Sequence, residues 1–388
     1  MAVNNMTREQ AYQLLGYLHG QATGNTTITP TDLSSFITVA QATLAAGNDQ
    51  VMNALSLVVS RTLIAVRPYT QKFRGLEMTT DMWGEVVRKI SFLDEDPEQN
   101  DEFNLTDGSS IDQQVINKPK VKQFNYVGSD VWSKHFTIFR KQLHGAFDSP
   151  ESFGSFMTGI MTHFVNLRTQ WMEEMARSCL CNFIAAKYEM NIDVIHLLTE
   201  YNSATGGSYT ATSIKDPANF PGFVKWVYAR VANLTELMTE RSEKFQAPIT
   251  GARIVRHTPL QDQKVYLASE FLNEISARVL ADTYHDNFLT YSDVEAVNYW
   301  QAIDSPLSIQ VTPAIIDSDG DYQVGTAQSL SNVLGVIFDR DAIGYNIYWD
   351  EMSTSPYNSR GSYWNLWNVV NARYQVDLTE KGIVLMLD

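Results

Sequence analysis

The sequence predicts an α+β protein organised around one very long helix, and three observations lead to that prediction. From Pro150 to about Asn191, apolar residues recur at steps of three and four, which is typical of one face of a helix. No proline interrupts the pattern before Pro217, so the helix would extend over roughly 60 Å at ~1.5 Å per residue. Segments before and after it alternate like strands, and two of those strands flank a long polar excursion.

Composition narrows the class of protein. A hydrophobic content of 44% over 388 residues allows a sizeable core and excludes wholesale disorder. The formal net charge of −15 argues against a dedicated DNA-binding protein, because phosphate contacts need clustered Lys and Arg. Cys179 and Cys181 lie two apart on the predicted helix, so their side chains diverge and we expect reduced thiols. We expect neither a signal peptide nor a membrane span, since no apolar run approaches ~18 residues.

Three helices are predicted at the N-terminus. Thr7 and Gln10 fit a capping box, and Gly20 is the expected end of the first helix. A second helix is expected from Pro30–Asp32 to about residue 47, and a third over residues 49–66. Because the first helix is thinly apolar, we expect an arm whose partner surface lies elsewhere, on another subunit.

The polar excursion is predicted between strands at residues 83–92 and 123–127, followed by β-rich sequence through Phe139. Its acidic leg comprises Asp94, Glu95, Asp96, Glu98, Asp101 and Glu102, and its basic leg comprises Lys118, Lys120 and Lys122. With so little apolar content the excursion cannot carry a core of its own. Two interpretations remain open: a solvated loop, or a projecting hairpin with at least one charged leg seated on a neighbouring subunit.

The long helix is followed by a mixed α/β region. The expected helices cover residues 222–244 and 271–280, and the expected strands cover residues 252–257, 264–267, 307–311 and 333–338. The terminus, from Tyr345 to Leu387, is aromatic and β-branched and therefore predicts long closing strands.

The sequence contains no pattern typical of catalysis. It has no GxSxG, phosphate loop, GxGxxG, HExxH or CxxC motif, and its seven histidines have no metal-ligand spacing. Residues 317–321 (DSDGD) superficially resemble a calcium loop, but the glycine falls at position four and position twelve is Gln328, so a hairpin turn is expected. Residues 339–341 (DRD) predict a turn with local charge pairs. We therefore expect neither an enzyme nor a cofactor or metal site.

The order of these parts resembles a known family. Residues 71–75 (QKFRG), the helix start from Ser152 through Asn182, residues 336–341 (VIFDRD) and residues 358–365 (NSRGSYWN) carry the resemblance. Together they are similar to the Hong Kong-97-type major capsid protein of tailed double-stranded DNA phages, and more closely to the phi-29-type small short-tailed phages. Ser359 and Ser362 replace the Pro and Leu of that family's Asn-Pro-Arg-Gly-Leu-Tyr-Trp-Asn pattern, so the turn is expected to be looser.

The resemblance implies a division of the chain and a function. It implies an N-terminal arm (1–70), an extended loop (71–148), a peripheral domain with a spine helix (149–199), an axial domain (200–343) and closing strands of the peripheral domain (344–388). The protein would self-assemble as pentamers and hexamers into an icosahedral head, in the host cytoplasm and then in the virion. Its partners would be further copies of itself, a scaffolding protein, a portal or connector, and packaged double-stranded DNA bound non-specifically on the inner face. Expected inter-subunit contacts are both charged legs, Arg360 and Trp364.

Two alternatives stand beside the capsid interpretation. An encapsulin-like compartment shell has the same fold but encloses cargo protein, so the contents of the particle would separate the two. A soluble α/β enzyme is disfavoured by the missing motifs.

Overall fold

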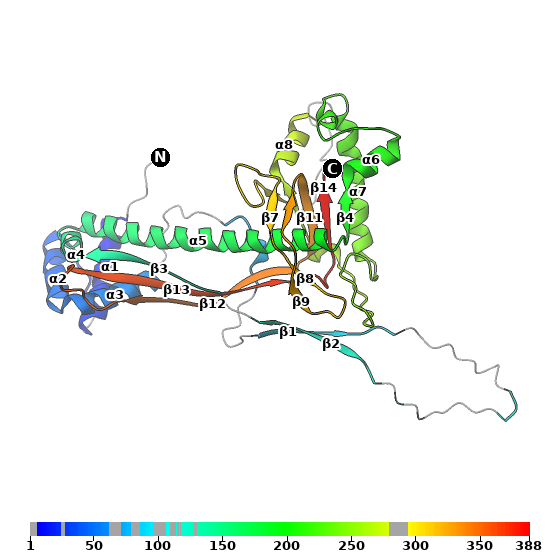
Figure 1. Cartoon of the computed structure of the whole chain (residues 1–388). Helices are drawn as coiled ribbons and strands as arrows, with labels where there is room; N and C mark the ends of the chain where they lie inside the picture. The colour runs from blue at the N-terminus through cyan, green and yellow to red at the C-terminus, as the bar shows by residue number, and fades with distance from the viewer. Residues whose placement is uncertain are drawn as a thin grey trace. The chain divides into compact units, whose positions relative to one another are not determined.

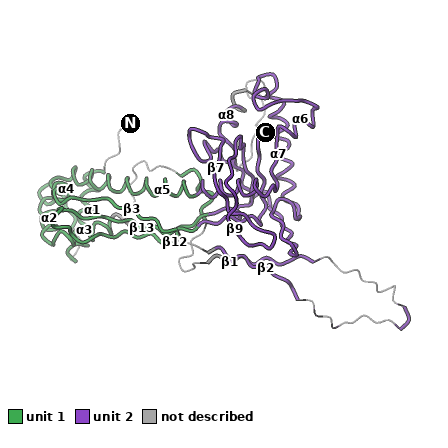
Figure 2. The backbone as a smooth tube through the Cα atoms, viewed as in Figure 1, with its two compact units in different colours: residues 1–84, 128–175, 345–373 green, residues 85–127, 176–344, 374–388 purple. Residues whose placement is uncertain are grey.

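The computed structural model describes residues 6–24, 28–61, 71–78, 86–95, 106–108, 114, 116, 118–127, 130–278 and 294–388. These residues form a mixed α+β fold (Figure 1) that divides into two compact units (Figure 2). Unit 1 comprises residues 1–84, 128–175 and 345–373, and unit 2 comprises residues 85–127, 176–344 and 374–388.

Unit 1 begins with three helices: α1 (Arg8–Thr23), α2 (Leu33–Ala45) and α3 (Asn48–Arg61). The predicted capping box is present, since the Thr7 side chain accepts from the Gln10 N–H and the Gln10 side chain accepts from the Thr7 N–H. The predicted end at Gly20 is wrong. The helix continues past that glycine, which it tolerates at a cost of about 1 kcal/mol, and ends at Gly24 in the left-handed region at φ 69°.

The three N-terminal helices pack inside their own unit, which corrects the expectation of an arm that needs another subunit. Leu15 and Leu18 of α1 are fully buried in a cluster with Phe36 of α2 and Phe153 of the long helix. The Phe36 and Phe153 rings meet edge to face at 6.2 Å. The apolar surface of α1 is small, yet its partners come from distant parts of the same chain.

The predicted long helix is confirmed as α5 (Pro150–Glu189), a single helix of 40 residues. Ser149 begins it, because its hydroxyl accepts from the Ser152 N–H at 3.1 Å. Within unit 1 the helix packs on aromatic side chains of a sheet, where Trp132 stacks on Trp171 with ring centroids 5.3 Å apart. Both cysteines of α5 are buried free thiols, as expected.

The sheet of unit 1 has three strands in the order β12 (Ile343–Thr354), β13 (Tyr363–Val376) and β3 (Asp130–Phe139). β13 and β3 are antiparallel in a register that opposes Tyr363 to Phe139 and Ala372 to Asp130. The short helix α4 (Arg140–Ala146) links β3 to α5. The expected closing strands are therefore present.

Unit 2 is built on a five-stranded sheet in the order β4 (Val194–His196), β14 (Gly382–Met386), β11 (Val333–Asp339), β5 (Gln263–Ala268) and β6 (Val294–Val297). Every residue of β11 is buried, and β11 runs antiparallel to both neighbours. Helices α6 (Leu197–Thr205), α7 (Phe220–Thr239) and α8 (Ser269–Arg278) belong to the same unit, and α7 supplies much of its core.

Smaller elements complete the described chain. They are the strands β7 (Ile309–Val311), β8 (Ala314–Ile316), β9 (Tyr322–Val324) and β10 (Gln328–Leu330), and the 3-10 helices η1 (Arg74–Leu76), η3 (Ser213–Lys215) and η4 (Leu260–Asp262).

Loop predictions in unit 2 have mixed outcomes. The hairpin turn at residues 317–321 is confirmed, with Gly320 at φ 89° between β8 and β9. The turn at residues 339–341 is also confirmed, and Arg340 contacts Asp341 at 3.6 Å and Asp262 at 3.0 Å. The predicted strand at residues 252–257 is wrong. That segment makes isolated bridges, Arg256 with Ser242 and Ala252 with Ile249, because nearby loop groups satisfy its backbone.

Candidate functional site

The polar excursion arises from a two-stranded ribbon, β1 (Val86–Phe92) and β2 (Val121–Val127), which belongs to unit 2. The strands are antiparallel, with Phe92 opposite Val121 and Lys89 opposite Phe124. Since side chains alternate along a strand, the ribbon has two faces. We call the face with Lys89, Ser91, Lys122, Phe124 and Tyr126 the covered face, and the face with Arg88, Ile90, Phe92, Val121, Gln123 and Asn125 the open face.

The covered face lies against the rest of unit 2. Ser91 and Phe124 are 8% and 4% exposed. Lys122 donates from Nζ to the Asp319 carbonyl at 2.6 Å, and the Tyr126 ring meets the Tyr322 ring at a centroid distance of 5.9 Å. The ribbon therefore does find a partner surface within its own chain, on the covered face.

An ion cluster lies at the centre of the covered face. The Lys89 ammonium forms ion pairs with Asp377 and Glu380, both from the turn between β13 and β14. Arg256 pairs with Glu380 at 2.6 Å and donates to the Ser91 hydroxyl at 2.8 Å. The turn and the ribbon are thus joined by two cations and two carboxylates, in an environment where the Asp377 side chain has no exposure to solvent.

Burial and charge act in opposite directions on the two carboxylates. Burial tends to raise the pKa of Asp377, but the Lys89 ammonium and the hydrogen bonds from Thr379 outweigh it and hold that pKa below its ordinary value. Burial raises the pKa of Glu380 above its ordinary value, although Lys89 and Arg256 oppose the shift. Asp377 is therefore the carboxylate whose charge this cluster stabilises.

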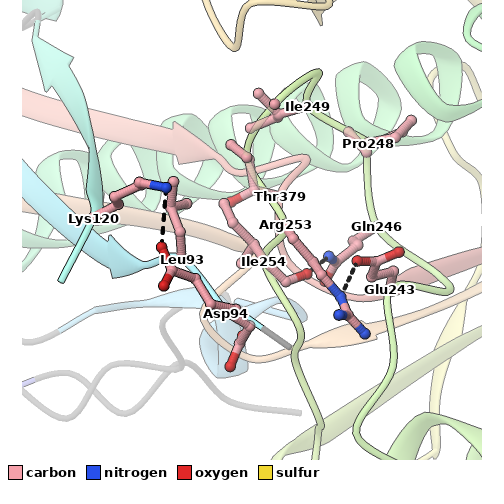
Figure 3. A pocket seen from close by; sticks show the side chains of 14 residues that line it. Leu93, Asp94, Lys120, Glu243, Gln246, Pro248, Ile249, Arg253, Ile254 and Thr379 are labelled. Carbon is pink, nitrogen blue, oxygen red and sulfur yellow. Dashed lines mark hydrogen bonds and ion pairs between the residues drawn. The ribbon is translucent and has the colours of Figure 1, made fainter. Parts of the chain in front are cut away.

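A pocket of about 420 Å³ opens beside the ribbon (Figure 3). Lys120 pairs with Glu95 at 3.0 Å on one side, and Arg253 pairs with Glu243 at 2.9 Å on the other. All four side chains are at least 40% exposed, so each pair contributes only about 0.2–1 kcal/mol. The pocket has polar walls of both signs.

The open face presents apolar side chains to solvent. Phe92, Ile90 and Val121 are 68%, 58% and 53% exposed. Phe92 and Val121 are directly opposite each other in the register, and Ile90 is two residues from Phe92 on the same strand. These three side chains form one contiguous apolar patch, flanked by exposed polar residues at positions 88, 123 and 125.

The structure brings some of the predicted contact residues of the acidic leg onto their own unit. Asp94 pairs with Arg241, and its carboxylate also accepts from the Val255 N–H at 3.1 Å. Glu95 faces the basic leg through Lys120. Asp96, Glu98, Asp101 and Glu102 lie outside the described residues.

The remaining predicted residues lie apart. Lys118 is exposed, and no carboxylate of the described residues lies within ion-pair distance of its ammonium. Arg360 is exposed in the turn before β13, far from the ribbon in sequence and in the other unit. Trp364 is 1% exposed and donates from Nε1 to Asp49 at 2.7 Å, so its indole is a core group of unit 1.

Sequence reasoning missed the ion cluster. Residues 377–381 (DLTEK) followed by glycine look like an exposed hairpin turn, and Lys89 looks like a solvent-facing strand residue. The available signal was the alternation of side chains along the strand, which places Lys89 and Ser91 on one face and Ile90 and Phe92 on the other. Whichever face packs on the protein, either the apolar residues are exposed to solvent or the charged residue is buried.

The described residues offer little for chemistry. No group of three or more His, Cys, Asp or Glu in that part of the chain could hold a metal ion. Among the helices described, none is both long and apolar enough to cross a membrane. The exposed apolar patch of the open face is the feature that favours a surface for macromolecular contact.

This chain matches one protein family by sequence and several solved phage structures by fold. The Phi29-like phage major capsid protein family matches residues 19–386. A capsid chain of Staphylococcus phage Andhra has a TM-score of 0.53 at 12% identity, over 84% of this chain and 87% of that one. A chain from the structure of the head fiber and inner core protein of bacteriophage P68 has a TM-score of 0.55 at 13% identity, with the same coverage. No curated protein sequence matches this chain.

Proposed function

This chain belongs to the Phi29-like phage major capsid protein family, and we propose that it assembles as pentamers and hexamers into an icosahedral head around double-stranded DNA. Family membership makes it a structural, non-enzymatic component of the virion that associates with copies of itself. The same match favours the phage capsid over the compartment shell that encloses cargo protein. We propose, beyond family membership, that the copies are arranged as pentamers and hexamers and that the shell contains double-stranded DNA.

Within the proposed shell, the parts of the chain take the roles of a Hong Kong-97-type protein. Residues 200–343 would be the axial domain, and its support is the five-stranded sheet with α6, α7 and α8. Residues 149–199 and 344–388 would be the peripheral domain, supported by α5 and the long strands β12 and β13. Residues 1–70 would be the N-terminal arm, whose described helices pack inside unit 1, and residues 71–148 would be the extended loop.

One observation carries the proposal that the extended loop contacts a neighbouring copy: the two faces of the ribbon differ. The covered face is satisfied inside unit 2 by ion pairs and by burial of Phe124. The open face leaves Ile90, Phe92 and Val121 uncovered. An exposed apolar patch rimmed by polar residues is typical of an interaction surface, and the natural partner of a self-assembling protein is another copy.

We also propose that the charged legs contact neighbouring copies of the protein. Lys118 and Lys120 are both exposed, and Lys120 also pairs with Glu95 at the surface, whereas Lys122 donates to a carbonyl of its own unit. A scaffolding protein, a portal or connector and packaged DNA are further proposed partners. The net charge of −15 suits a wall that encloses DNA without binding it tightly.

Replacing Phe92 with Ser tests the contact of the open face. We expect the unassembled protein to keep its unfolding midpoint, because Phe92 is already 68% exposed, while the yield of closed shells falls at least about tenfold. Electron microscopy and sedimentation of assembly reactions measure the yield. Leu260→Ser, at a residue that is 56% exposed elsewhere in unit 2, is the matched control and should assemble normally. Equal yields for the two variants would count against the proposed contact.

A further inference from the structure

The angle at which the ribbon lies on the rest of unit 2 is set by the attachments of its covered face. They are the ion pairs of Lys89, the hydrogen bonds of Ser91 with Arg256 and of Lys122 with Asp319, and the ring contact of Tyr126 with Tyr322. Among the described residues of β1, Lys89 is the one whose side chain forms ion pairs with the rest of the unit. An isolated two-stranded ribbon is marginally stable in water, so its orientation has to come from such attachments. Lys89 is also only 20% exposed, which means that its ion pairs are partly shielded from solvent.

The turn that receives Lys89 is itself firmly held. The Asp377 N–H donates to the Ala342 carbonyl at 2.7 Å, and the Asp377 carboxylate accepts from the Thr379 N–H and hydroxyl at 2.8 and 2.7 Å. Lys381 donates from Nζ to the Glu240 carbonyl at 2.7 Å, just after α7. Asp377 and Glu380 therefore present two carboxylates at fixed places.

We propose that Lys89 is a positioning residue for the ribbon, whose ammonium holds the ribbon at one angle by bridging Asp377 and Glu380. A cation held by two fixed carboxylates is constrained in two directions, unlike one in a single ion pair. Arg256 adds a second link from the receiving side, because it binds both Glu380 and the Ser91 hydroxyl of β1. With the covered face fixed in this way, the open face points in one direction on every copy.

This inference rests on the proposed contact of the open face, but it can be tested without assembly. In the unassembled Lys89→Met variant, amide hydrogen exchange in β1 and β2 should become at least about tenfold faster, while exchange in β5 and β11 stays unchanged. Lys89→Arg should retain the protection, because a guanidinium can also bridge two carboxylates. Unchanged exchange in β1 and β2 of Lys89→Met would overturn the inference.

Two further variants separate positioning from other effects. Arg88→Met removes a neighbouring cation from the open face of the same strand, and it should leave exchange at the parent rate. The double variant Lys89→Met, Asp377→Asn also removes the buried carboxylate that Lys89→Met leaves without a cation, but it does not restore the bridge. Amide exchange in β1 and β2 should therefore remain fast. Restored protection in this double variant, or equally fast exchange in Arg88→Met, would overturn the inference.

Shell yield then tests the proposed function separately. If Lys89→Met loosens the ribbon and lowers the yield of closed shells, both the positioning role and the contact are supported. If it loosens the ribbon but shells form at the parent yield, Lys89 still positions the ribbon, and the proposed contact of the open face is wrong.

Discussion

Lys187 allows a pH-dependent stability to be predicted from the structure. Its side chain is fully buried near the C-terminal end of α5, donates to the Phe245 carbonyl at 3.0 Å, and lies 3.5 Å from the Asp193 carboxylate. Burial lowers the pKa of Lys187 from 10.5 to about 8, against the opposing effect of Asp193. At about 1.4 kcal/mol per pKa unit, keeping this ammonium charged in the folded protein costs about 3 kcal/mol.

The direction of the pH effect follows from proton binding. Between pH 8 and 10.5 the unfolded chain holds a proton on Lys187 that the folded protein has released, so the free energy of unfolding rises with pH. From pH 7 to 9.5 this contribution should increase the free energy of unfolding by about 2 kcal/mol. Below pH 8 the lysine is protonated in both states, and the full cost is present.

Replacing Lys187 with Met removes the titrating group with little change in volume. Because that change alone leaves the Asp193 carboxylate buried without its cation, a second variant also carries Asp193→Asn, which suits φ 55° at that position. Between pH 7 and 9.5, the free energy of unfolding of the wild type should rise by about 2 kcal/mol more than that of either variant. Guanidinium unfolding of the unassembled protein, followed by circular dichroism, measures the difference.

Lys187→Met alone, without Asp193→Asn, controls for the titration of the nearby Lys381. Burial also lowers the pKa of Lys381, and Asp193 opposes that shift, so the double variant changes the surroundings of Lys381 as well. Lys187→Met alone keeps Asp193 in place. If the free energy of unfolding changes with pH equally in the wild type and in Lys187→Met, the assignment of the buried charge to Lys187 is refuted.

Three further predictions concern separate parts of the chain. Reversing Lys118 and Lys120 to Glu should leave the unfolding midpoint nearly unchanged and reduce shell yield most at low salt, where repulsion is least screened; equal yield at low salt would contradict it. Gly335→Ala should lower the free energy of unfolding by about 1–3 kcal/mol, because a Cβ there would lie 2.7 Å from the Tyr266 carbonyl oxygen; chemical denaturation measures this. Burial raises the pKa of Cys179 and Cys181 to about 12, so a disulfide reagent at pH 8 should label both only after unfolding, as mass spectrometry would show.

Local patterns predicted the elements whose causes are local. The long helix was predicted from Pro150 because a hydroxyl cap, a first-position proline and a helical apolar period all occur within that segment, and the helix does begin there. The turn at residues 317–321 was predicted from Asp-Gly, since Gly320 takes the positive φ that the turn requires. In both cases the residues that decide the structure are neighbours in sequence.

Features with distant causes were missed. The small apolar face of α1 was expected to need another subunit because its partners, Phe36 and Phe153, cannot be identified from residues 8–23. The ion cluster joins Lys89 to Asp377, which are 288 residues apart, and alternation along the strand shows which face Lys89 shares but not which carboxylate lies opposite it. Similarly, the segment at residues 252–257 has strand-like alternation, but the partners of its backbone are loop groups.

The two faces of the ribbon suggest how one polar segment can be ordered in the free protein and still be available for assembly. The covered face is fastened by charge, and a buried ion pair that loses one partner is strongly destabilised, so this face should stay closed before and after assembly. Among the residues whose side chains are described, the open face exposes Ile90, Phe92 and Val121 as its apolar patch, and a patch of three side chains is too small to drive association of two copies alone. Repetition at every subunit supplies the remainder, because each added copy is held by several contacts at once. Weak contacts that are individually reversible also let a misplaced copy dissociate before the shell closes. A net charge of −15 on each free copy acts in the same direction, since it opposes association until several contacts form together.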